Sequence, residues 1–158
     1  MKQFVCNYAS LRFLPYRETG EFINIGVVVH CPQTDFFGFR LAPSHRTARV
    51  THFFPNLNKE LLKAALQGME KELMRIQAQH QGLRLTEEIP PAVAQEQIAN
   101  FCQLVRRREG LLHFGDIGTV MAVTPEKALE ELFCRFVERH SEDTQRSSRG
   151  QAPVAEVA

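Results

Sequence analysis

The first third of the chain alternates between apolar and polar positions, which is typical of β-strands. Along residues 5–13 most of the large apolar side chains fall on odd positions, as Leu11 and Phe13 show. Two further strands are predicted over residues 21–31 and 36–41. The connections between them hold Gly20 and the segment Pro32–Asp35, which have the composition of tight turns. These segments predict an antiparallel meander.

Pairing the first two strands tests whether one register sorts their side chains into two faces. If Pro15 lies opposite Glu21, Phe13 faces Ile23, Leu11 faces Ile25 and Ala9 faces Val27. The six facing side chains are all apolar, so they form a core face.

The third strand extends this pattern. If Cys31 lies opposite Phe37, Phe39 meets Val29 and Leu41 meets Val27, again on the core face. The same register places polar and small side chains on the other face. Its larger members are Tyr8, Arg12, Asn24, His30 and Arg40, and its small ones are Ser10, Gly26 and Gly38.

This second face is the candidate binding face. Arginine captures carboxylate or phosphate in a bidentate manner, so the face could hold an anion, a peptide backbone or a stacked base. The alternative is that it is the solvated face of a two-layer fold, with Gly26 marking a β-bulge.

Helical periodicity begins after the strands. Leu62, Leu66, Met69, Leu73 and Ile76 step by three or four, which predicts a helix ending near residues 81–82, with Asn56 or Asn58 as its N-cap.

A second helix is predicted from residues 89–91 to 106–110. A last one starts at Thr124 as N-cap with Pro125 in its first turn, and it buries Leu129, Leu132, Phe133, Phe136 and Val137. Residues 111–114 and 120–123 predict two short strands, and residues 46–54 predict another.

These elements predict an α+β fold, an antiparallel sheet of about four to six strands with two to three helices packed on one face. We expect residues 1–140 to form a single domain. Residues 141–158 lack periodicity and large apolar groups, which predicts a disordered C-terminal tail.

Composition narrows the function classes. The 158 residues carry a formal net charge of +1, so no global basic field attracts nucleic acid. No apolar run approaches the roughly 20 residues that cross a bilayer. We therefore expect no membrane partner and a cytoplasmic location, without a signal peptide.

The sequence offers few candidates for catalysis. The four cysteines are widely spaced and are expected to be buried apolar side chains. His30 beside Cys6 could suggest a metal site or a nucleophile pair, but two ligands do not make structural zinc and no third group is marked. Arg106, Arg107 and Arg108 form a candidate basic patch, which fits either a helix C-terminus or a phosphate contact. We expect no cofactor.

The order of the segments resembles a known family. "YASLRFLPYRETGEFINIGVVVHCP", then "HFFPNLNKELLKAALQGMEKEL" and "REGLLHFGDIGTVMAVTPEKALEELFCRFV", are similar to a bacterial family catalogued as domain of unknown function 3037. The block G-E-F-x-N-x-G is its most specific part. Thr124 stands where the family often has Asp, and Phe114 where it often has Trp. The resemblance implies no catalytic residues, and it implies a role as companion of a HipA-type kinase.

We therefore predict a non-enzymatic protein-binding or accessory module that uses the candidate binding face. The first alternative is a nucleic-acid-binding domain that uses this face and the basic patch, with salt-sensitive affinity. The second is an enzyme of unrecognised type.

Overall fold

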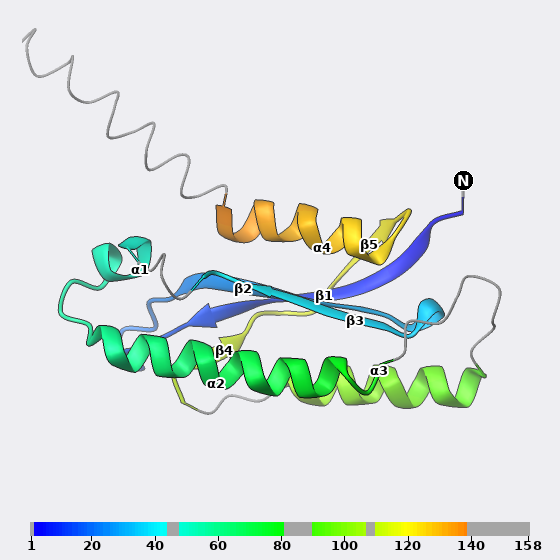
Figure 1. Cartoon of the computed structure of the whole chain (residues 1–158), viewed down its shortest axis with the longest axis horizontal. Coiled ribbons are helices and arrows are strands. Elements are labelled where there is room, and N and C mark those ends of the chain that lie inside the picture. Colours follow the sequence, from blue (N-terminus) through cyan, green and yellow to red (C-terminus); the bar gives the residue numbers. More distant parts are fainter. Residues whose placement is uncertain (1, 44–47, 81–89, 107–109, 139–158) are drawn as a thin grey trace, which may run out of the picture.

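The computed structural model describes residues 2–43, 48–80, 90–106 and 110–138. Five strands and four α-helices follow one another along this part of the chain (Figure 1). In order they are β1 (Phe4–Phe13), β2 (Ile23–Cys31), a 3₁₀ turn η1 (Pro32–Thr34), β3 (Phe36–Leu41), α1 (Ala48–Phe53), α2 (Lys59–Gln77), α3 (Pro91–Arg106), β4 (Leu112–Phe114), β5 (Gly118–Ala122), α4 (Pro125–Phe133) and a π-helical turn η2 (Cys134–Glu138). The predicted α+β fold is confirmed. The predicted tail at 141–158 lies outside the described residues.

All strand pairs are antiparallel, and β1 lies at the centre of the sheet. On one side β1 pairs with β2, which pairs with β3. On the other side two short strands share its length: β5 pairs with residues 4–8 and β4 with residues 11–13. The meander β1-β2-β3 is therefore confirmed, and the C-terminal strands complete the sheet beside its N-terminal strand.

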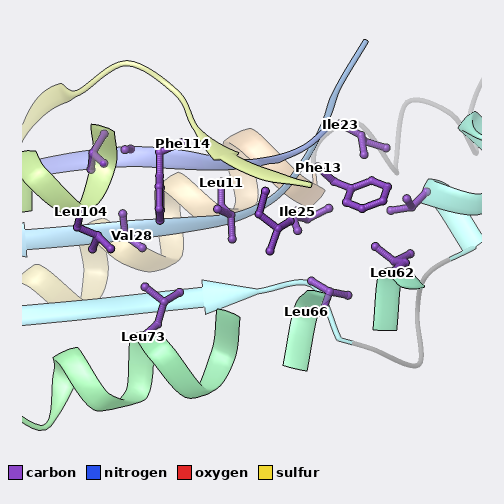
Figure 2. Packing of buried hydrophobic residues seen from close by; sticks show 14 of the residues in the cluster. Leu11, Phe13, Ile23, Ile25, Val28, Leu62, Leu66, Leu73, Leu104 and Phe114 are labelled. Carbon is purple, nitrogen blue, oxygen red and sulfur yellow. The ribbon is translucent and has the colours of Figure 1, made fainter. Parts of the chain in front are cut away.

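Two helices, α2 and α3, pack on one face of the sheet as expected, but α4 covers the other face, which was not expected to carry a helix. In Figure 1, α2 and α3 lie below the sheet and α4 lies above it. The core is correspondingly divided into two clusters of buried side chains. One contains Leu11, Ile25 and Val28 with Leu73 of α2 (Figure 2), and the other contains Val27 with Leu132 of α4.

A β-bulge explains why the predicted register fails beyond the first turn. Phe13 lies opposite Ile23 and Arg12 opposite Asn24, as expected, but Leu11 then lies opposite Gly26 and skips Ile25. Such a bulge shifts all later pairs by one residue. Val28 consequently points toward α2 and α3, while Val27 and Val29 point toward α4.

The second hairpin is also shifted by one residue from the predicted pairing. Cys31 lies opposite Phe36 rather than Phe37, and Gly26 lies opposite Leu41. A Cβ on Gly26 would stand 2.6 Å from Leu41 Cδ2 and 2.9 Å from the carbonyl oxygen of Arg40. The glycine inside this apolar strand therefore permits close approach of β3.

The strand predicted over residues 46–54 is wrong, since its described part forms helix α1. Val50 and Phe54, four residues apart, are both buried in the cluster under α2, and the Phe54 amide donates to the Val50 carbonyl at 2.9 Å. Burial of this pair outweighs the β-propensity of Val50 and Thr51, because propensity differences are small beside packing.

The predicted helix starts are confirmed. Asn58 Oδ1 accepts from the amide of Glu60 at 3.0 Å, and Thr124 Oγ1 accepts from the amide of Lys127 at 3.3 Å. Pro125 occupies the first turn of α4, where its missing N–H costs nothing. The end of α2 at Gln77 lies about one turn before the predicted one. Within the described ranges, no helix has the length and apolar character needed to cross a membrane.

Candidate functional site

Helix α4 and its continuation η2 cover much of the predicted binding face. Tyr8 packs against Phe136 of η2, with ring centroids 5.8 Å apart. The Arg40 guanidinium lies over the Phe133 ring at 4.4 Å, and it forms a half-exposed ion pair with Glu138 at 3.9 Å. The face is therefore partly covered by α4 and η2 at these residues and is not an open depression.

Arg12 and Asn24 do lie opposite each other, immediately before the bulge. The Arg12 guanidinium stacks on the Phe22 ring at 4.2 Å. Arg49, which the sequence did not single out, reaches the same end of the sheet from α1. Its guanidinium donates to the carbonyl oxygens of Val137 and, at 3.4 Å, of Asn24. Burial lowers the pKa of Arg49, and its contacts tie α1 to β2 and η2.

His30, the fifth residue predicted for this face, lies on the opposite side of the sheet because of the bulge. It is fully buried, and its ring stacks on Phe101 of α3 at 5.3 Å. It therefore does not converge with Arg12 or Arg40, and the idea of a His30–Cys6 pair is wrong, since Cys6 belongs to the cluster under α4.

A polar cluster missed by the sequence reasoning surrounds His30. His80 Nδ1 lies 2.9 Å from Asp35 Oδ1, and the Gln97 amide donates to the same oxygen. The His80 ring centroid lies 5.6 Å from that of His30. The side chains of His80 and Asp35 are only 14% and 11% exposed. These bonds join the β2–β3 connection to the segment just after α2 and to the middle of α3, and thereby hold these elements together.

The basic patch is only partly described. Arg106 is exposed and is the last residue of α3, while Arg107 and Arg108 lie outside the described residues. Among the described residues, no group of three or more His, Cys, Asp or Glu is arranged to hold a metal ion.

A groove lies between the outer strand β3 and helix α2, and we call it the β3–α2 groove. Its volume is about 410 Å³. It is lined by residues 39–43 of β3 and the following segment, and by Leu66, Gln67 and Glu70 of α2. Its apolar part comes from Phe39, Leu41 and Leu66, while Gln67, Glu70 and Arg40 supply polar groups at its margin.

The backbone of β3 beside this groove ends the sheet among the described strands. The Ala42 amide donates to the Ile25 carbonyl at 2.7 Å, so Ala42 directs its backbone toward β2. In an antiparallel ladder, alternate residues direct N–H and C=O to the same side. Gly38 and Arg40 therefore also face β2, while Phe37, Phe39 and Leu41 direct their N–H and C=O groups to the outer edge.

The groove and the edge were missed because no sequence motif marks them. The available signal was topological: a three-stranded meander always leaves one outer strand, and β3 keeps that position. Of the five residues predicted for binding, only Arg40 borders the groove.

Comparisons with known proteins give one match. A family model described as "Protein of unknown function (DUF3037)" matches residues 8–137. Comparison with curated proteins and with solved structures gave no match.

Proposed function

The chain belongs to the DUF3037 family of proteins of unknown function, and from that premise we propose that it is a non-enzymatic module binding an extended segment of a partner protein along the outer edge of β3. The observation that carries the proposal is the coincidence of unpaired strand backbone with the β3–α2 groove. Addition of a strand to a sheet edge supplies main-chain hydrogen bonds, and adjacent pockets supply selectivity.

The backbone of β3 offers the hydrogen bonds. Phe37, Phe39 and Leu41 present N–H and C=O groups to the outer edge, alternating with residues bonded to β2. A peptide strand that pairs with them would satisfy these groups without changing the existing sheet.

The side chains offer selectivity. Successive residues of a strand point to opposite faces, so a bound strand would direct every second side chain toward α2. There it would meet the apolar floor formed by Phe39, Leu41 and Leu66, which suits an aliphatic residue. The intervening side chains would point toward α4, where Arg40 suits an acidic or polar residue.

Features that limit unselective pairing are also present. Charged residues and prolines on outer strands discourage edge-to-edge aggregation. Arg40 lies within β3, and Pro43 lies two residues after Leu41, the last residue of β3. A partner strand must therefore match the groove as well as the backbone.

Amide exchange and peptide binding test the proposal. The probes are short soluble peptides with aliphatic residues at alternate positions, screened against the full chain by NMR. We expect a bound peptide to slow exchange at the Phe39 and Leu41 amides, whereas the Gly38 and Arg40 amides are protected already. A peptide that protects β5 or no strand at all overturns the assignment.

Two substitutions on α2 give a matched comparison. Gln67→Arg places a long charged side chain at the groove, and Ala64→Arg places the same side chain on an exposed position of α2 that does not line it. Gln67→Arg should weaken binding about tenfold, roughly 1.4 kcal/mol, and Ala64→Arg should leave it unchanged. Equal effects of the two variants contradict the proposal.

A second copy of the chain is the competing occupant of the β3 edge. If the full chain dimerises at the concentrations used, and the Phe39 and Leu41 amides are protected without peptide, a second copy occupies β3 and the proposal fails. A purified HipA-type kinase is a suitable protein probe, because the family resemblance implies such a companion. Its binding should show the same sensitivity to Gln67→Arg.

A further inference from the structure

Two cysteines lie on the neighbouring strands β1 and β2, near the start of β1 and at the end of β2, on the face covered by α4. The register that pairs Asn7 with His30 brings Cys6 of β1 opposite Cys31 of β2, one residue further along. Both thiols are free and fully buried, and both belong to the cluster of buried side chains under α4. Phe133 and Leu132 of α4 belong to the same buried cluster.

We propose that Cys6 and Cys31 form a site of reversible oxidation, in which a hydroperoxide converts the two thiols into one disulfide between β1 and β2. Opposite residues of antiparallel strands have Cα atoms about 4.5–5.5 Å apart. That spacing lies within the range of about 4.4–6.8 Å found across disulfides, so the positions of the two residues permit the bond.

The surroundings make the two sulfur atoms unequal. Cys31 is the last residue of β2 and the N-cap of η1, where its side chain makes no capping hydrogen bond. The neighbouring Cys6 thiol lowers the pKa of Cys31, and the polar groups of Thr34 and Gln33 lower it further, while burial opposes them. The pKa of Cys6 is raised, first by the neighbouring Cys31 and then by burial, with a smaller effect from Glu126. Cys31 is therefore the nucleophile and Cys6 the resolving thiol.

The chemistry balances with one hydroperoxide. The Cys31 thiolate attacks the peroxide oxygen, the O–O bond breaks, and the departing hydroxide takes a proton to become water. This leaves a sulfenic acid on Cys31. The sulfur of Cys6 then attacks the Cys31 sulfur, the S–O bond breaks, and the Cys6 proton leaves with the hydroxyl group as a second water. Two thiols are oxidised, and one peroxide is reduced.

Burial selects the oxidant. Both sulfur atoms lie beneath α4, so a bulky disulfide such as oxidised glutathione is excluded while the cover is closed. Hydrogen peroxide is close to water in size and can reach the thiols through small local openings.

The test uses the full chain with Cys102→Ser and Cys134→Ser, which leaves only the proposed pair. After treatment with hydrogen peroxide we expect loss of both free thiols, a mass decrease of two hydrogen atoms and no intermolecular dimer. A phosphine reductant should restore both thiols. Adding Cys6→Ser should stop the disulfide and leave a sulfenic acid on Cys31, which dimedone traps when the treated protein is unfolded in its presence. Circular dichroism before and after treatment confirms that each variant is folded.

Three results would overturn the proposal. In the background variant, retention of both thiols after treatment would show that the pair is inert. Dimers alone would show that the sulfur atoms react only between chains. If the further change Cys6→Ser is poorly folded, Cys6→Ala replaces it. Absence of a dimedone adduct on Cys31, when a folded variant is treated with peroxide and then unfolded in the presence of dimedone, would refute its role as nucleophile.

Discussion

The buried His30 should make the stability of the protein depend on pH in a specific window. Its imidazole is fully buried, and burial lowers its pKa from 6.5 to about 4, with a further lowering by His80 that Asp35 partly opposes. Phe101 and Phe37 supply aromatic neighbours in the same cluster. The folded state therefore favours the neutral ring.

The direction of this pH dependence follows from whether the folded or the unfolded chain binds the proton. Above pH 6.5 the ring is neutral in both the folded and the unfolded chain, so His30 adds no pH dependence. Between pH 6.5 and 4 mainly the unfolded chain binds the proton, so the free energy of unfolding falls as the pH falls. The shift from 6.5 to about 4 corresponds to about 3 kcal/mol lost across this window.

Urea unfolding of the wild type and of His30→Leu at several pH values between 4 and 7 measures this effect. The substitution removes the titrating ring and leaves His80 and Asp35 in place. We expect the wild type to lose about 3 kcal/mol more than the variant on acidification. The variant can be less stable at neutral pH, because it loses the stacking on Phe101, but this offset does not change the slope. Parallel pH profiles for the two proteins would refute the reasoning.

Other substitutions test the remaining contacts by thermal or urea unfolding. Gly26→Ala should lower the free energy of unfolding by about 1–3 kcal/mol, since its Cβ would meet β3. Gly68→Ala, with open space around it in α2, should raise the free energy of unfolding by about 1 kcal/mol. Equal effects of the two substitutions would contradict the close approach at Gly26. Leu132→Ala should lower the free energy of unfolding by about 2–5 kcal/mol, because Leu132 lies on the buried face of α4 and is 2% exposed. A loss below about 1 kcal/mol would show that α4 does not pack tightly against the sheet. Thr124→Ala should cost about 0.5–2 kcal/mol by removing the cap of α4, and Thr124→Ser, which keeps the hydroxyl, should recover most of it.

The sequence was most informative where local chemistry decides the structure. The caps at Asn58 and Thr124 and the pairs Phe13–Ile23 and Arg12–Asn24 are as predicted. Each depends on residues close in sequence or on the first turn of a hairpin. Alternation of apolar and polar residues also identified β1 to β3 correctly as strands.

A bulge marked by Gly26 was only the alternative interpretation of this strand, and the structure has one immediately before Gly26, where the register skips Ile25. The covered second face was not predicted, although the sequence held a signal for it. Strands buried on both faces read as continuous apolar runs, and Val27, Val28 and Val29 form such a run. The predicted pairing assumed that only one face of this run is buried, and it therefore kept a single register along the whole strand. A single extra residue at Ile25 then moved His30 to the other face, which no alternation pattern could reveal.

The candidate site depends on long-range contacts. Gly26 approaches Leu41, and Leu66 of α2 joins Leu41 in the β3–α2 groove. Asp35 and His80 are likewise 45 residues apart in sequence. Periodicity shows which side of an element is apolar, but it does not show which two elements pack together. The groove could therefore be identified only from the packing of α2 beside β3 in the structure.

The central position of β1 has a consequence for the order in which the chain folds. During synthesis β1 and β2 emerge first, and their hairpin can form early. The other side of β1 must wait for β4 and β5, since Phe4 pairs with Ala122. Until then a long strand keeps one row of backbone groups unpaired, and such edges are prone to join other nascent chains. Closure of a loop of this length is slow compared with hairpin formation. The last strands to be made are thus the ones that protect the first, and truncations before residue 118 should yield aggregates and not a smaller folded domain.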